Sequence, residues 1–323
     1  MTDHRSPTPP GASGGTCVFV IGMHRSGTSA VTGALAQLGL AGPSGDDLIG
    51  ATASNQRGHY ESKLLTRVDN QLLHLLGGTW SAPPARQPGW ELERRFVGLR
   101  PAAGRAFDKT FPARPVAWKD PRNCLVLPFW RSVVTPPVAA VLVYRDGLEV
   151  ARSLHARSQV NLTHGLALWE RYVRTSCTDL DGVATFVVEY GRLLENPSSF
   201  CDSVIAFLAD VGITVDDTRL PAAVSSLDGG LRHSRAPIDG PAAVVDHRHL
   251  LDTLREFDGP HQPWRAPDLG AEPEWVEDVL SLRREYEVLN RQVRSSRAMR
   301  LVDGWWRLRG SRRPPPRKDE DDR

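Results

Sequence analysis

The chain has 323 residues, 40% of them hydrophobic, and its 40 Lys and Arg side chains nearly balance 38 Asp and Glu side chains, for a formal net charge of +2. This balance excludes a protein whose main task is to wrap nucleic acid, and no apolar run approaches the roughly 18 residues of a membrane span. The 4 cysteines show no CxxC spacing, and no secretory leader is visible, which argues against a zinc site or a disulfide framework and favours the cytoplasm.

Strands alternating with helices are predicted after a polar leader over residues 1–15. Short apolar runs rich in β-branched residues predict buried strands, and apolar residues at helical spacing predict the helices. A helix over Glu91–Phe107 is weakened by Gly98 and Pro101. The strands are expected at Cys17–Ile21, Val116–Trp118, Val138–Tyr144 and Ala184–Val188, and the helices at Ala30–Leu38, Glu61–Leu76, Leu148–Arg157, Leu162–Leu180 and Pro197–Val211. This alternation predicts an α/β domain over residues 16–270, with a mostly parallel central sheet flanked by helices and Val138–Tyr144 near its centre.

The C-terminal part carries a different pattern. Apolar residues recur at alternating spacings of four and three: Trp275, Val279, Leu282, Tyr286, Leu289 and Val293. The spacing predicts a long helix, which fits docking on its own domain better than a coiled coil. A helical extension is therefore expected over residues 271–310 and a disordered charged tail over 311–323. Twelve basic and three acidic side chains lie in residues 283–318, so residues 275–310, with Trp305 and Trp306, are a candidate contact surface for a membrane or a second copy of the chain.

The run Gly22–Ser29 (GMHRSGTS) joins the first predicted strand to the first predicted helix. Backbone N–H groups at such a junction point toward one spot, and the helix dipole favours an anion there. Gly27 lets the backbone approach closely, Thr28 and Ser29 offer hydroxyl donors, and Arg25 adds positive charge. The run therefore predicts a phosphate or sulfate site, with a tight turn that binds nothing as the alternative. It lacks the lysine of a Walker A loop, which disfavours a kinase or NTPase.

Two motifs in this order resemble those of the sulfotransferase family that uses 3′-phosphoadenosine 5′-phosphosulfate (PAPS). The run Arg25–Ser29 is similar to the family's 5′-phosphosulfate loop. Arg145 and Ser153 match the Arg and Ser that hold the 3′-phosphate of the donor, although Gly147 stands where proline is usual. Further similar segments are Asn55–Glu61, Lys119–Arg122, Leu168–Tyr172 and Val188–Leu194, so the resemblance covers roughly residues 16–235. It implies a P-loop-NTPase-like sulfotransferase fold, PAPS as donor, adenosine 3′,5′-bisphosphate as product, and no metal.

The resemblance also implies roles for individual residues. Donor binding falls to Arg25, Ser26, Gly27, Thr28, Ser29, Arg145, Ser153 and Arg232, although the Gly-rich run around Arg232 could equally be an ordinary surface loop. Arg25 would face the bridging oxygen, and Lys119 would help to neutralise the sulfonate. The general base is left open among Glu61, which is favoured, His59 and His24.

The acceptor is expected to be a hydroxyl group of a glycan, a glycolipid or a natural product, with the loop over residues 79–114 shaping its site. No nucleic-acid partner is expected. The predicted location is the cytoplasm, with peripheral contact at the inner membrane face as an option. Two other functions remain open, namely a nucleotide-binding kinase or NTPase, and an adaptor that binds a membrane or partner through the basic C-terminal helix.

Overall fold

Five strands form one sheet in the computed structural model, which describes residues 15–50, 60–135, 137–227 and 248–295. The strand order is β2-β1-β3-β4-β5. The first four strands run parallel, and β5 pairs antiparallel with β4. The bounds are β1 Cys17–Ile21, β2 Val116–Lys119, β3 Val138–Tyr144, β4 Ala184–Glu189 and β5 Gly259–His261. The predicted mostly parallel sheet is confirmed, and β3 is its middle strand, as its continuous apolar sequence indicates.

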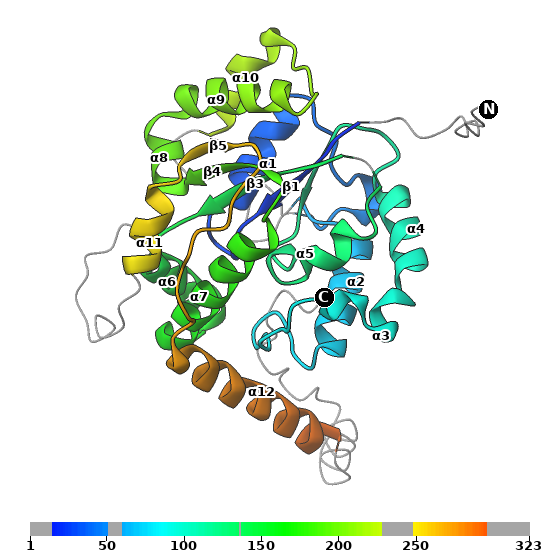
Figure 1. Ribbon diagram of the computed structural model, residues 1–323, viewed down its shortest axis with the longest axis vertical. Coiled ribbons are helices and arrows are strands. Elements are labelled where there is room, and N and C mark those ends of the chain that lie inside the picture. Colours follow the sequence, from blue (N-terminus) through cyan, green and yellow to red (C-terminus); the bar gives the residue numbers. More distant parts are fainter. Residues whose placement is uncertain (1–14, 51–59, 136, 228–247, 296–323) are drawn as a thin grey trace, which may run out of the picture.

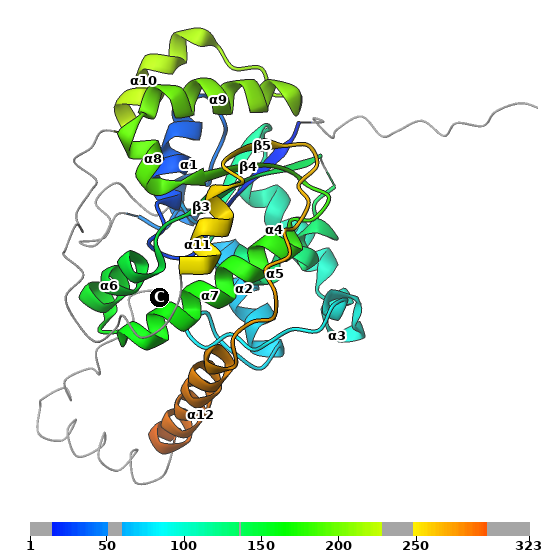
Figure 2. The same ribbon diagram turned by 60° about the vertical axis from the view of Figure 1, so that its left-hand side comes forward.

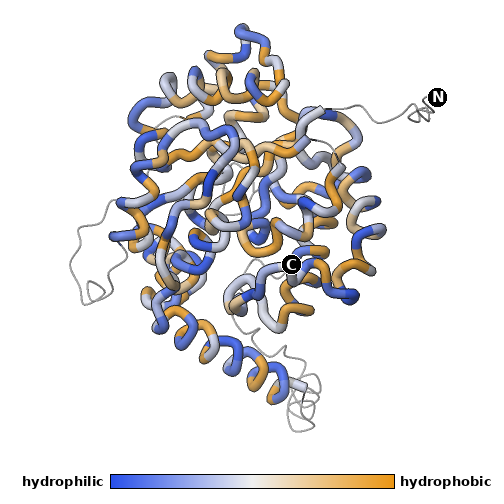
Figure 3. The backbone as a smooth tube through the Cα atoms, in the orientation of Figure 1, coloured by the Kyte–Doolittle hydropathy of each residue, from blue (hydrophilic) through white to orange (hydrophobic). Residues whose placement is uncertain are grey.

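Helices cover both faces of this sheet (Figures 1 and 2). One face carries α1 Thr28–Gln37, α8 Tyr190–Glu195, α9 Pro197–Asp210 and α10 Leu220–Ser226. The other face carries α2 Lys63–Leu75, α3 Arg94–Val97, α4 Arg100–Thr110, α5 Asn123–Arg131, α6 Gly147–Ser158, α7 Leu162–Asp179 and α11 Arg248–Arg255. Side chains of a strand alternate between the two cores, so Phe19 and Ile21 of β1 join one and Val18 and Val20 the other. Segments rich in hydrophobic residues accordingly gather along the sheet (Figure 3).

Most predicted elements lie where the sequence pattern places them, and the exceptions have local causes. The weak helix over 91–107 is two helices, because α3 ends at Gly98 and Pro101 lies in the first turn of α4. The α5 helix was not predicted. It contains Pro128 and is apolar almost all round, so its sequence shows no polar face. The short elements α8, α10, α11 and β5 were also not predicted.

The C-terminal helix α12, Glu274–Ser295, is present and extends from α7 away from the sheet (Figure 2). Its first half packs on the domain through Val276 and Leu280, both fully buried. The last four residues of the predicted apolar stripe instead face outward: Leu282, Tyr286, Leu289 and Val293 are 69%, 56%, 58% and 49% exposed. The docking face of α12 is thus shifted by one residue from the predicted stripe. Among the described residues, no helix is long and apolar enough to cross a membrane.

Candidate functional site

The glycine loop and Arg145 follow the two strands between which the order of the sheet reverses. The chain passes from β1 to β2 on one side, and β3 lies on the other side of β1. Ile21 at the end of β1 is in register with Leu142 near the end of β3, so the two following loops leave the same edge side by side. Open α/β sheets bind ligands outside the carboxyl ends of the strands at such a switch point.

The backbone of the glycine loop turns through two left-handed residues, Arg25 at φ 70° and Gly27 at φ 95°. Gly27 is the N-cap of α1, and its carbonyl accepts from the N–H groups of Ala30 and Val31. The first N–H groups of a helix have no partner within the helix and carry a partial positive charge. The loop therefore has the backbone of an anion site at the start of α1.

The surroundings of the Ser26 hydroxyl indicate whether this loop suits a phosphate. Its side chain is 1% exposed, and its Oγ has no hydrogen-bond partner among the described residues. A buried hydroxyl left without a partner costs about 1–3 kcal/mol. A phosphate held in the loop would accept a hydrogen bond from the Ser26 hydroxyl and remove this cost, so the residues present fit an anion. Thr28 is buried and Ser29 half-buried in the same turn.

The two predicted anion motifs meet in space. The Nε of Arg25 donates to the Oγ of Ser153 on α6 at 2.9 Å, across 128 residues of sequence. The Nη1 of Arg145 lies 3.3 Å from the Arg25 carbonyl oxygen, to which it donates. Arg25, Arg145 and Ser153 therefore form one cluster at the switch point, in which Arg25 contacts both of the other residues.

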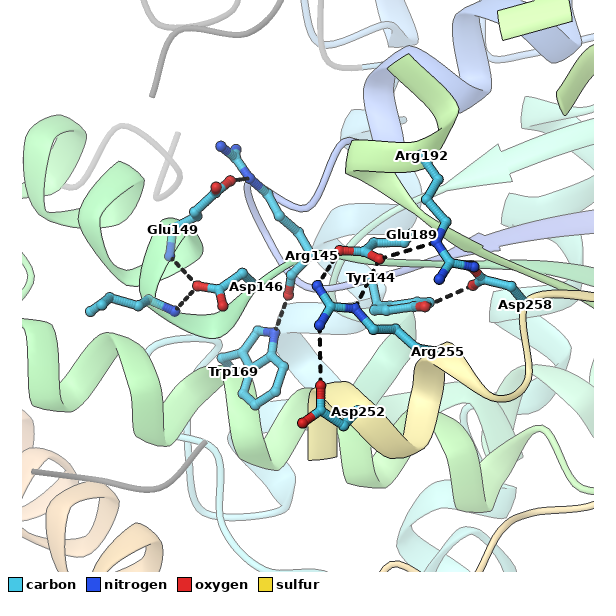
Figure 4. Close-up of polar contacts among 11 residues, drawn as sticks. Tyr144, Arg145, Asp146, Glu149, Trp169, Glu189, Arg192, Asp252, Arg255 and Asp258 are labelled. Atoms are coloured by element: carbon cyan, nitrogen blue, oxygen red, sulfur yellow. Dashed lines mark hydrogen bonds and ion pairs between the residues drawn. The ribbon is translucent and has the colours of Figure 1, made fainter. Parts of the chain in front are cut away.

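Arg145 is oriented by its neighbours at the end of β3 (Figure 4). Its Nε donates to Glu149 at 2.7 Å, and its carbonyl accepts from Trp169 Nε1 at 2.9 Å. Trp169 also accounts for Gly147, which departs from the family pattern. A Cβ at position 147 would lie 2.8 Å from the indole ring, so only glycine leaves room for this tryptophan.

Tyr190 links the two motifs and was not predicted as a site residue. It follows β4, and the Cζ of Arg145 lies 5.4 Å from the centre of its ring. The same ring covers Gly27, where an added Cβ would be 2.0 Å from Tyr190 Cδ2. Two signals in the sequence could have marked it: its position just after the end of a predicted parallel strand, and its place within Val188–Leu194, one of the segments that resemble the family.

Ion pairs hold the neighbouring edge of the sheet beside Arg145 (Figure 4). Arg255 at the end of α11 donates to Glu189 at 3.0 Å, and Arg192 of α8 pairs with Asp258 at 2.7 Å. Asp258 also accepts from the Tyr144 hydroxyl at 2.7 Å. These contacts connect the carboxyl ends of β3 and β4 to α11.

A buried charge cluster lies at the carboxyl end of β2. Lys119 is in register with Val20 of β1, so this cluster is one strand away from the glycine loop. The Nζ of Lys119 donates to Oε1 of Glu61, and both side chains are buried. The Nη1 of Arg122 lies 3.9 Å from the other carboxylate oxygen of Glu61. Burial raises the pKa of Glu61 above its ordinary value, and Lys119 opposes part of this rise.

Asp120 and Arg122 lie next to that cluster and pair with each other. Asp120 accepts from the Arg122 backbone N–H at 2.9 Å, from Arg122 Nη1 at 3.2 Å and from the Thr66 hydroxyl at 2.7 Å. Burial opposes ionisation of Asp120, but Arg122 and these hydrogen bonds bring its pKa below the ordinary value. Arg122 also donates to Asn70 of α2 at 2.9 Å. This network fixes Lys119 and Glu61 between β2 and α2.

Of the other two candidates for the general base, the structure describes His24 but not His59. His24 is 5% exposed, and its ring lies 4.8 Å from that of Trp80 and 5.9 Å from that of Tyr172. This aromatic packing favours a shaping role for His24 in the loop. His59 and Arg232 lie outside the described residues, as do Trp305 and Trp306. No group of three or more His, Cys, Asp or Glu side chains in the described ranges could hold a metal ion.

Comparison with known proteins gives similarity in structure alone. No family model matches the chain, and no curated protein matches it. The sulfotransferase domain of the Synechococcus PCC 7002 olefin synthase is 16% identical, with 86% of this chain and 98% of that chain covered and a TM-score of 0.39. The sulfotransferase domain of the curacin biosynthetic pathway is 12% identical, with 83% and 97% covered and a TM-score of 0.41. Both are sulfotransferase domains, the class that the motifs resemble.

Proposed function

We propose that this chain is a sulfotransferase that moves the sulfuryl group of PAPS to a hydroxyl acceptor. The observation that carries the proposal is the cluster of Arg25, Arg145 and Ser153 at the switch point. A donor with phosphate at both its 5′ and 3′ positions needs two adjacent anion sites, which the glycine loop and the Arg145 turn would supply. The missing Walker A lysine weighs against an NTPase.

The residues divide between the two ends of the donor. The hydroxyls of Ser26, Thr28 and Ser29 and the backbone of the loop would hold the 5′-phosphate, and Arg145 with Ser153 would hold the 3′-phosphate. Arg25 would face the oxygen that bridges phosphorus and sulfur. Its positive charge would stabilise the phosphate that leaves.

Transfer requires one bond to form and another to break at sulfur. The acceptor oxygen attacks sulfur, the bond from sulfur to the bridging oxygen breaks, and adenosine 3′,5′-bisphosphate leaves. We assign the acceptor proton to Glu61, because a carboxylate whose pKa is raised by burial is a stronger base. Lys119 beside it would balance the negative charge of the sulfonate.

The acceptor class is a hydroxyl group on a glycan, a glycolipid or a natural product. Residues 79–84, which reach the glycine loop through Trp80, would border its site. Contact with a membrane face or a second copy through residues 275–310 is a separate proposal, supported by the exposed apolar residues of α12.

Calorimetry with adenosine 3′,5′-bisphosphate tests the proposal. The wild type should bind, and Arg145→Ala and Arg25→Ala should each lose about tenfold to a hundredfold in affinity, since hydrogen bonds to charged groups are worth about 1.5–3 kcal/mol. Arg95→Ala is the matched control, because Arg95 is half-exposed on α3 and pairs with Glu93. Absence of binding by the wild type, or magnesium-dependent ATP hydrolysis instead, would contradict the proposal.

A further inference from the structure

The α12 helix binds the segment Thr79–Pro84 through the carboxylate of Glu287. Oε2 of Glu287 accepts from the Thr79 hydroxyl at 3.0 Å, and Oε1 accepts from the Ser81 hydroxyl at 2.8 Å. Arg283, one helical turn earlier, donates to Oε1 at 3.1 Å. Both oxygens of Glu287 are thus used to hold a segment about 200 residues away in the sequence.

A second contact holds the far end of the same segment. The Pro83 carbonyl accepts from Arg284 of α12 at 2.8 Å and from Arg171 of α7 at 3.1 Å. Glu277 of α12 pairs with both of these arginines. The segment is therefore held at Thr79, Ser81 and Pro83 by side chains of α12 or by the α7 arginine that α12 binds.

The segment in turn packs on the glycine loop. Trp80 is 3% exposed, and its ring lies 4.8 Å from that of His24, which precedes Arg25. The Trp80 carbonyl accepts from the Tyr172 hydroxyl at 2.8 Å. Nε2 of His164 lies 2.6 Å from the Ser81 carbonyl, to which it donates, because a carbonyl only accepts. Contacts therefore run without a break from α12 to the residue beside Arg25.

We propose that Glu287 is a positioning residue for the glycine loop and acts on it through Thr79–Pro84 and His24. Its loss would leave the Thr79 and Ser81 hydroxyls without their carboxylate and free Trp80 to shift against His24. Arg25 and the backbone of the loop would then lose their fixed geometry. The effect on nucleotide binding rests on the proposed function, whereas the effect on the loop does not.

Hydrogen exchange read by mass spectrometry tests the mechanical part without any ligand. In Glu287→Ala, exchange should quicken severalfold in residues 22–29 and 79–84. Glu285→Ala is the matched control, since Glu285 lies exposed on the same helix and should leave both segments unchanged. Unchanged exchange in residues 22–29 of Glu287→Ala would overturn the proposal.

Comparing the binding of two nucleotides distinguishes a change in the position of the glycine loop from a general loss of structure. Adenosine 3′,5′-bisphosphate should bind Glu287→Ala about tenfold more weakly, whereas adenosine 3′-monophosphate, which lacks the 5′-phosphate, should lose clearly less affinity. Some loss is expected with it, because Arg25 also contacts Ser153 and Arg145. Glu287→Gln keeps one oxygen acceptor and should recover most of the affinity. An equal loss with both nucleotides would overturn the proposal. If the wild type binds neither nucleotide, the proposed function fails, and hydrogen exchange alone decides the positioning role.

Discussion

At the scale of single residues, Gly27 and Tyr190 constrain the backbone of the glycine loop where it joins α1. Gly27 has φ 95° at the N-cap of α1, a conformation in which a side chain is strained. The Tyr190 ring lies against the position that a Cβ would take. The same ring lies beside Arg145, so one aromatic side chain contacts both predicted anion motifs.

Gly27→Ala should therefore damage both stability and nucleotide binding. Its Cβ would meet Tyr190 at 2.0 Å in a strained conformation, so we expect a loss of more than about 1 kcal/mol of unfolding free energy. Affinity for adenosine 3′,5′-bisphosphate should fall with it. Urea unfolding and calorimetry measure the two effects. Gly42→Ala is the control, because no atom lies within 4 Å of its added Cβ. Equal stability of the two variants would count against this geometry.

Glu61→Gln should separate catalysis from donor binding. If Glu61 is the base, turnover should fall by about 10²–10⁴-fold while adenosine 3′,5′-bisphosphate still binds. Burial raises the pKa of Glu61, and a base works only when deprotonated. The wild-type kcat/KM should thus rise with pH through a pKa above the usual range of a glutamate, and this limb should vanish in the variant. Unchanged turnover would move the role to His59 or His24.

At the scale of elements, α12 shows that an apolar stripe does not by itself say which face of a helix is buried. The predicted stripe and the docking face overlap only near the start of the helix, where Trp275 and Val279 are partly buried against the core. Farther along, polar side chains such as Glu287 make the contacts with the domain, and the stripe faces outward. The neighbouring segment Thr79–Pro84 supplies the polar partners of this docking face.

Two leucines of α12, two residues apart, test this orientation. Leu280 is fully buried and Leu282 is 69% exposed. Leu280→Ala should cost about 2–5 kcal/mol of unfolding free energy, as buried leucines do, and Leu282→Ala about 0.5 kcal/mol or less. Urea unfolding measures both. The reverse ranking would show that the predicted stripe is the docking face.

At the scale of the whole molecule, the contacts of α12 raise the question whether residues 16–270 fold without it. Ending the chain at Gly270 removes Val276 and Leu280 from the core and takes Glu272 and Glu277 away from Arg171, which is 4% exposed. A buried charge without its partner costs about 3–5 kcal/mol.

We expect the chain ending at Gly270 to unfold at a much lower temperature than a chain ending at Ser295, which keeps α12. Thermal unfolding followed by circular dichroism measures both. Equal melting temperatures for the two chains would instead support residues 16–270 as a self-sufficient domain, the division that the sequence predicts.

Local patterns were enough to predict much of this fold. Continuous apolar runs predicted β1 and β3 with their observed bounds, because a strand buried on both faces has no polar side. The glycine loop was predicted because a strand, a glycine-containing turn and a helix follow one another within a few residues. α5 was not, since Pro128 and its apolar surroundings hide the helical period.

The sequence by itself determined the α/β class and the two anion motifs, because both arise from residues close together in the chain. Only the tertiary structure decided that Arg25 meets Ser153 across 128 residues, that Lys119 pairs with Glu61, and that Tyr190 lies against both motifs. These contacts depend on strand order and register, which bring distant residues to one edge of the sheet and which no short stretch of sequence encodes.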